Sequence, residues 1–127
     1  MKVLRPLIMA SLLFTATAAS AQVSEYAGTM YASMTEASFQ WMEDRIATLD
    51  EVVNLTDDQQ TAVKEITVRY AYRVDALLKK DMEPEKLAMH KNDLFQYRMD
   101  DYKNILTPSQ LSLLEENMEL LQADNKE

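Results

Sequence analysis

The sequence predicts an all-α protein built from four helices. Only one glycine, Gly28, occurs in 127 residues. Apolar residues recur every three or four positions over most of the chain, and strong helix-start signals stand at two corners between such stretches. Tight β-hairpins and phosphate-binding loops need glycine for positive φ angles or close backbone approach, so neither is expected. Short links between helices predict that consecutive helices run antiparallel.

The first 21 residues have the layout of a secretory signal. Lys2 and Arg5 precede the apolar run PLIMASLLF, and small residues ending in an A-x-A triplet at 19–21 follow. The apolar run is short for a membrane span and no second run follows, so we expect export without membrane insertion. Residues 22–127 then form a single helical domain, with flexible ends expected.

Charge and cysteine content exclude several classes of partner and chemistry. Cleavage after residue 21 would remove two of the 13 basic residues and none of the 21 acidic ones, which changes the net charge from −8 to −10. Nucleic acids and anionic membrane surfaces attract basic proteins, so neither is an expected partner. The chain has no cysteine, so it depends on packing for stability and has no thiol chemistry.

The first two predicted helices cover about 23–49 and 57–80. In each, apolar side chains spaced by three to four residues form one stripe that faces the rest of the protein. The stripe of the first helix consists of Tyr26, Met30, Met34, Ala37, Trp41, Ile46 and Leu49. The stripe of the second consists of Val63, Ile66, Tyr70, Val74, Leu77 and Leu78.

The third and fourth predicted helices cover about 84–103 and 108–122. The third has two apolar faces, one with Leu87, His90, Leu94, Tyr97 and Ile105 and the other with Phe95, Met99 and Tyr102. Two faces need two neighbours, and a second copy of the chain would bury one of them, so we expect a homodimer. The fourth helix carries the stripe Leu111, Leu114, Met118 and Leu121.

The phrase Leu-Thr-x-x-Gln occurs twice, from Leu55 and from Leu106, 51 residues apart. A threonine at a helix N-cap accepts a hydrogen bond from the backbone three residues on, and a glutamine at that position bonds back to the cap; this is a capping box. Thr56 with Gln59 and Thr107 with Gln110 fit the pattern. Each motif therefore predicts a sharp corner followed by a helix start.

Residues beside the two motifs support these corners. Pro108 would stand at the first helical position, where its missing N–H carries no penalty. Leu106 is placed to pack on Leu111 as a hydrophobic staple. Asn54 and Asn104 are the residues expected to take the left-handed backbone conformation that ends the preceding helices.

Two such motifs in an exported, cysteine-free helical chain resemble the Spy/CpxP family of periplasmic proteins, whose signature is a pair of LTxxQ motifs. The matching residues are Leu55, Thr56, Gln59, Leu106, Thr107 and Gln110. The resemblance implies a curved antiparallel hairpin layer that dimerises into a cradle. It also implies an ATP-independent chaperone for unfolded client proteins, or an adaptor for an envelope-stress sensor protein. Family cradles are typically basic on the concave face, whereas this chain is acidic.

The residues 61–80 form a locally basic stretch, with a net charge of +3 in the acidic chain. Arg69 and Arg73 lie four residues apart, on one helix face with Tyr70. These three residues are candidate client contacts, acting through charge first and apolar contact second. The alternative is that they are solvated or salt-bridged side chains beside the core stripe.

The methionines divide into two expected groups. Met82 and Met89 stand near the corner before the third helix and are expected to add an adaptable, exposed binding surface. Met30, Met99 and Met118 fall on apolar stripes and are expected in the core.

Catalysis is not expected, and neither is a cofactor. The single histidine, His90, is the one candidate base of the usual type, and there is no serine elbow or metal-spaced histidine pair. Two alternatives remain: a zinc-responsive periplasmic protein with His90, Asp93 and Asp101 as ligands, and a haem-binding bundle ligated by Met30 or Met34 with His90.

Overall fold

The computed structural model describes residues 25–126, and this part of the chain is all-helical without strands. A short 3₁₀ helix, η1 (Met30–Ser33), precedes five α-helices: α2 (Glu36–Val53), α3 (Asp57–Leu78), α4 (Pro84–Lys103), α5 (Pro108–Glu116) and α6 (Met118–Lys126). The predicted signal at 1–21 lies outside the described residues. Within 25–126, no helix combines the length and apolar character needed to cross a membrane.

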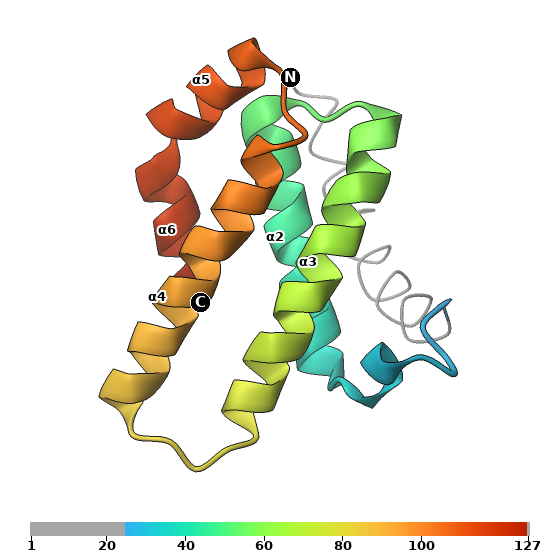
Figure 1. Ribbon diagram of the computed structural model, residues 1–127, viewed down its shortest axis with the longest axis vertical. Coiled ribbons are helices and arrows are strands. Elements are labelled where there is room, and N and C mark those ends of the chain that lie inside the picture. The colour runs from blue at the N-terminus through green and yellow to red at the C-terminus, as the bar shows by residue number, and fades with distance from the viewer. Residues whose placement is uncertain (1–24, 127) are drawn as a thin grey trace, which may run out of the picture.

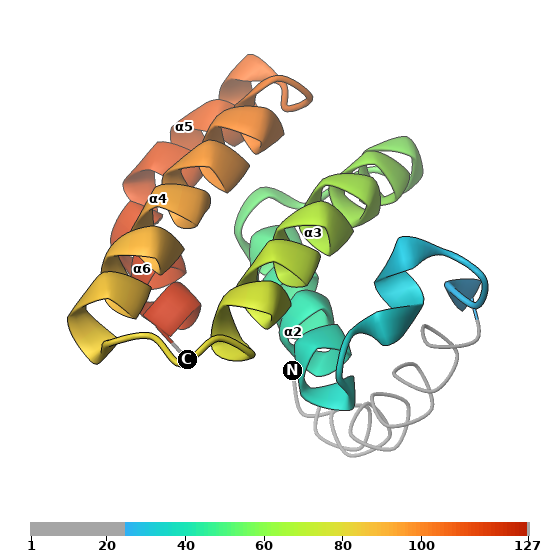
Figure 2. The ribbon, with the colours of Figure 1, turned by 60° about the horizontal axis from the view of Figure 1, so that its bottom comes forward.

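Helices α2, α3, α4 and α5 alternate in direction, as expected, and α6 continues in the direction of α5 (Figure 1). Both Leu-Thr-x-x-Gln corners therefore lie at one end of the molecule, and the loop between α3 and α4 lies at the other. Helix α2 packs on α3 and also on α5 and α6, while α3 packs on α4. The hairpin of α3 and α4 has α2 behind it, and α5 and α6 lie on the far side of α4 (Figure 2).

One hydrophobic core joins all five α-helices. Its most deeply buried members include Leu49 of α2, Val63 of α3, Phe95 and Tyr102 of α4, and Leu114 of α5. The buried Tyr102 hydroxyl lies 2.6 Å from Thr67 Oγ1, so its polar atom is satisfied inside the core. Helices α5 and α6 pack on α2, so helices of the described chain also cover one another. The curved hairpin layer and its dimeric cradle stay predictions.

The helix expected from residue 23 begins later in the structure. Gly28 has a φ of 83°, and a turn and η1 follow before α2 begins at Glu36. Thr35 is the N-cap of α2, and its side chain accepts from the Ser38 amide. Met30 was expected in the core but is 60% exposed. That prediction was wrong because the apolar stripe assumed one continuous helix through residues that form two separate ones.

The structure also differs from the prediction within the fourth predicted helix and at the end of α4. The fourth predicted helix is interrupted at Asn117, whose side chain donates to the Leu113 carbonyl oxygen at 2.8 Å and ends α5. Asn54 takes the predicted left-handed conformation, with a φ of 57°. Asn104 does not, with a φ of −72°. The link from α4 to α5 is one residue longer than the link from α2 to α3, so this corner closes through an ordinary turn.

Both predicted capping boxes are present. Thr56 Oγ1 accepts from the Gln59 amide at 3.2 Å, and Gln59 Oε1 accepts from the Thr56 amide at 3.0 Å. The corresponding distances for Thr107 and Gln110 are 3.3 and 2.9 Å. The leucines of both motifs, Leu55 and Leu106, are buried in the shared core. Each motif therefore starts a helix through its threonine and glutamine, and anchors its corner in the core through its leucine.

The two capping boxes also bond to each other through their glutamines. Gln59 Nε2 donates to Gln110 Oε1 at 2.7 Å, and Gln110 Nε2 donates to Gln59 Oε1 at 2.9 Å. Gln59 Nε2 also donates to the Ile105 carbonyl, and Gln110 Nε2 to those of Val53 and Asn54. We call this arrangement the glutamine clasp. It satisfies both side-chain amides and ties the corner after α2 to the corner after α4.

We predict that the two glutamines act as a coupled pair. Gln59→Ala and Gln110→Ala should each lower the free energy of unfolding, with Gln110→Ala at about 1–3 kcal/mol because it removes partners from buried carbonyls. The double variant should lose at least about 0.5 kcal/mol less than the sum of the single losses. Urea unfolding of the parent, the two single variants and the double variant measures this coupling energy. A control cycle of Gln59→Ala with Thr35→Ala, a cap elsewhere in the chain, should be additive. Additivity in both cycles would contradict the clasp.

Candidate functional site

The predicted cationic contacts lie on the exposed surface of the hairpin formed by α3 and α4. We call this surface the α3–α4 face and define it by Arg69, Tyr70, Arg73, Leu77, Lys80, His90, Asp93, Leu94, Tyr97 and Asp101. A hollow of about 350 Å³ lies on it, lined by residues from both helices and from the start of the loop between them. Apolar and charged side chains share its lining, so it offers two kinds of contact at one place.

Tyr70 links the two helices at this face. Its hydroxyl donates to Asp101 Oδ2 at 2.6 Å. Burial, together with the bond to this carboxylate, raises the pKa of Tyr70 to about 12. The guanidinium of Arg73 lies 5.5 Å from the centre of the Tyr70 ring, and Arg69 Nη2 lies 4.0 Å from Asp101 Oδ2. Both arginines therefore converge on the tyrosine–aspartate pair.

The three predicted contact residues have different exposures. Arg69 and Arg73 are exposed and available to a partner. Tyr70 is only 7% exposed and belongs to the hydrophobic core, so it does not offer the direct contact expected from the sequence. At the face, its ring lies beneath the Arg73 guanidinium and its hydroxyl donates to Asp101. The ion pair of Arg69 is long and exposed, and such pairs contribute little to stability.

Large apolar side chains are exposed on and near the same hairpin. Tyr97 of α4 is 56% exposed, Leu78 at the end of α3 is 56% exposed, and Met89 of α4 is 60% exposed. Met89 is thus exposed as predicted, whereas Met82 in the loop is half-buried. Met99 is buried as predicted, and Met118 packs partly buried against the core. Uncovered apolar surface of this kind is typical of a protein-binding region.

The residues proposed for zinc or haem are not gathered into a ligand set. His90 is exposed and lines the hollow with Asp93, whereas Asp101 is engaged by Tyr70. Among residues 25–126, no three histidine or carboxylate side chains are grouped so as to hold a metal ion. Met34 belongs to a separate buried cluster of α2 and α3, on which η1 packs, and Met30 is on η1 itself.

Two polar networks in the structure had no counterpart among the sequence motifs. In the first, the buried Asp75 accepts from Ser38 Oγ at 2.6 Å and from the Thr35 amide at 3.2 Å, and pairs with Lys79 at 2.8 Å. Burial alone would raise the pKa of Asp75, but the bonds from Lys79, Ser38 and Thr35 outweigh it and hold the pKa below its usual value. The network ties the start of α2 to the end of α3.

The second network surrounds the single tryptophan. The guanidinium carbons of Arg45 and Arg98 both lie 5.2 Å from the centre of the Trp41 ring. Arg45 Nε pairs with Asp124 Oδ2 at 2.6 Å, which joins α2 to α6. Arg98 is buried as well, but none of the acidic residues that the structure describes forms an ion pair with it.

Comparisons of the chain with protein-family models, with curated proteins and with solved structures found no match. The α3–α4 face combines two exposed cations, a hollow lined by apolar and charged side chains, and an exposed aromatic ring on one hairpin. Such a surface can hold an extended polypeptide segment that carries both acidic and apolar side chains.

We predict that Tyr70 contributes to the alkaline pH dependence of stability. Its pKa is about 12 in the folded protein and ordinarily 10, so the folded state holds its proton at pH values where the unfolded chain has lost it. This contribution is complete below pH 10 and is lost as the pH rises through 12. Tyr70→Phe should therefore lower the free energy of unfolding at pH 8 and make its decline between pH 10 and 12 shallower. Urea unfolding across that range tests this, with Tyr97→Phe as the control for loss of a hydroxyl. An unchanged slope for Tyr70→Phe would refute the assignment.

Proposed function

We propose that the protein is a non-enzymatic, ATP-independent chaperone-like protein of the periplasm, and that its α3–α4 face holds unfolded client segments. The observation that carries this proposal is the grouping of Arg69 and Arg73 with the hollow and the exposed Tyr97 on one hairpin. The secretory layout of 1–21 and the paired Leu-Thr-x-x-Gln motifs support it independently.

The charge distribution favours weak, reversible capture. The chain as a whole is acidic, with a net charge of −8, so non-specific contact with acidic proteins is unfavourable away from this face. At the face, Arg69 and Arg73 attract acidic segments of a client, and the hollow beside them takes apolar side chains. Exposed charge pairs form quickly and contribute little to affinity. A client would therefore be released without an energy source.

The family resemblance adds a homodimer to this proposal. On α4, Leu87 and Leu94 are half-buried and Tyr97 is exposed, so a second copy has apolar surface to cover. Leu94 and Tyr97 belong to the proposed client surface. Dimerisation there and client binding would compete for part of the α3–α4 face, and a dimer joined elsewhere would leave the face open. A dedicated sensor adaptor would use the same face for a single partner.

We predict that reversing the two arginines weakens chaperone activity without unfolding the protein. The assay is suppression of aggregation of an unrelated unfolding protein by residues 22–127, without nucleotide. Arg69→Glu with Arg73→Glu should lower suppression several-fold, because the attractive charge becomes repulsive. Both side chains are exposed, so the helical circular dichroism spectrum and the unfolding midpoint should stay close to those of the parent.

The matched control is Lys64→Glu with Lys103→Glu. It makes the same total change in net charge, with one substitution on α3 and one on α4, at ion pairs with Glu25 and Glu115 that lie outside the face. Suppression should be retained in this control. Equal loss in both double variants would mean that net charge alone matters, and inactivity of the parent protein would overturn the chaperone proposal. Mass measured in parallel shows whether the active species is a dimer.

A further inference from the structure

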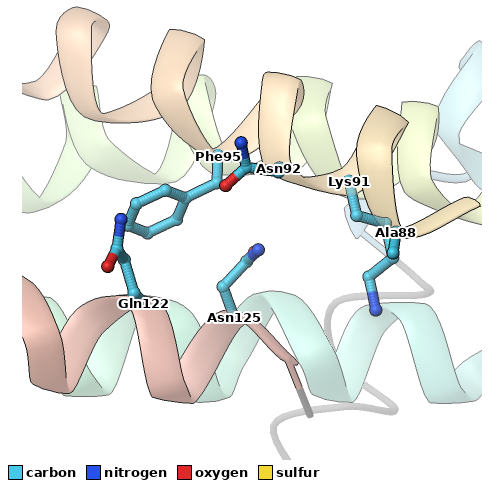
Figure 3. Close-up of a pocket in the computed structure, with 6 residues that line it drawn as sticks. All are labelled: Ala88, Lys91, Asn92, Phe95, Gln122 and Asn125. Atoms are coloured by element: carbon cyan, nitrogen blue, oxygen red, sulfur yellow. The ribbon is translucent and has the colours of Figure 1, made fainter. Parts of the chain in front are cut away.

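A second hollow lies between α4 and α6, away from the α3–α4 face. This α4–α6 groove has a volume of about 490 Å³ and is lined by Ala88, Lys91, Asn92, Phe95, Gln122 and Asn125 (Figure 3). The volume is within the range of small-molecule sites. The Phe95 side chain extends from α4 toward Gln122, and Asn125 rises from α6 into the space between the helices.

Among the residues that the structure describes, those lining the groove include no acidic residue, which is unusual for this chain. The protein has 21 aspartates and glutamates, yet the groove is lined by one cation, Lys91, three side-chain amides and two apolar residues. Amides and an ammonium group are hydrogen-bond donors, and the Phe95 ring and the Ala88 methyl group are apolar. The groove therefore combines positive charge and donors with an apolar wall.

Beside the groove lies Arg98, which is 3% exposed. Arginine does not lose its proton in proteins, so a full positive charge is buried here. Its polar partners are neutral: Nη1 donates to the Tyr102 hydroxyl and Nη2 to Asn125 Oδ1, both at 3.3 Å. Bonds between a guanidinium and a carboxylate are shorter, at about 2.7–2.9 Å. Among residues 25–126, Arg98 has no acidic partner to balance its charge.

The neighbouring Arg45 has an acidic partner, whereas Arg98 has none among residues 25–126. Arg45 lies on the same tryptophan ring at the same distance of 5.2 Å, and it has Asp124 at 2.6 Å. Besides its two neutral hydrogen-bond partners, Arg98 has the aromatic rings of Trp41, Phe95 and Tyr102 around it. Cation–π contacts attract the guanidinium but bring no negative charge. A buried charge without a counterion is unfavourable, so an anion placed nearby would stabilise this region.

Asn125 and Phe95 connect the buried charge to the groove. Asn125 lines the groove and accepts from Arg98, and the Phe95 ring lines the groove while its centre lies 5.6 Å from the Arg98 guanidinium. An anionic group at this point of the groove would meet Asn125 and Lys91 and would offset the charge of Arg98 behind them. The remainder of the ligand would lie beside the exposed Ala88 and reach only the edge of Phe95, which is 2% exposed.

We propose that the α4–α6 groove binds a small amphipathic carboxylate, with a short apolar chain beside Ala88 and the edge of Phe95 and its carboxylate held near Lys91 and Asn125. The site involves a different surface of α4 from the one that carries Leu94 and Tyr97. It is independent of the proposed chaperone function.

Isothermal titration of residues 22–127 with octanoate tests this proposal. Octanoate should bind saturably with one molecule per chain and at least about fivefold more tightly than octanol, which has the same chain but no charge. Lys91→Gln should weaken octanoate binding about threefold to fivefold, while Lys103→Gln, the same change elsewhere on α4, should not. The Arg69→Glu and Arg73→Glu variant should bind octanoate as the parent does, which separates this site from the α3–α4 face.

Asn125→Asp tests the role of the buried charge with an isosteric change. It places a carboxylate where Oδ1 already lies 3.3 Å from Arg98 Nη2, so it should raise the thermal unfolding midpoint and abolish octanoate binding. Asn92→Asp adds the same charge to the groove at a residue with no bond to Arg98, and should weaken octanoate binding without raising the midpoint. Failure of octanoate to bind, equal binding of octanol, or full octanoate binding by Asn125→Asp would each overturn the proposal.

Discussion

The reciprocal bond between Gln59 and Gln110 is the contact on which the arrangement of helices depends. Each glutamine first caps its own helix and then uses its remaining donors on its counterpart and on backbone carbonyls of the opposite corner. Every donor and acceptor of the two amides has a partner, so the pair is stable where a half-satisfied pair would be unfavourable. The clasp brings the two corners together at one end of the molecule. It thereby sets the relative position of α3 and α4.

At the opposite end of the molecule, a network around a buried carboxylate holds α2 and α3 together. Asp75, with Thr35, Ser38 and Lys79, joins the start of α2 to the end of α3. With the clasp at one end and this carboxylate at the other, α2 supports α3 along its length. Within residues 25–126, Leu78 and Met89 are exposed at the loop end of the hairpin. Helix α2 thus holds α3 in place beneath the exposed apolar and cationic surface. A surface that binds clients repeatedly needs such support from the elements below it.

Local patterns predicted the parts of this fold that local interactions determine. A capping box needs partners three residues apart, so the sequence alone revealed both helix starts at Thr56 and Thr107. The spacing of apolar residues does not reveal the break before α2, which depends on the positive φ of Gly28 and on the N-cap at Thr35. The side-chain cap at Asn117 that ends α5 has no comparably strong pattern.

Contacts between distant residues could not be predicted in this way. The two glutamines lie 51 positions apart and Asp75 lies 40 from Thr35, so no spacing rule links them. The burial of Arg98 depends on how α4 and α6 meet around Trp41, which the helical pattern does not define. The candidate face was partly predictable, because Arg69 and Arg73 share a helix face by periodicity alone. The hollow beside them depends on how α4 packs against α3.

Site-specific photo-crosslinking tests the central claim, that clients bind the α3–α4 face, most directly. A photoreactive phenylalanine analogue would replace Tyr97, which is exposed on the face, or Leu113, which is exposed on α5. Each protein would be irradiated with an unfolding client. The account predicts client adducts from position 97 and few from position 113. Equal adducts at both positions, or none at position 97, would contradict it.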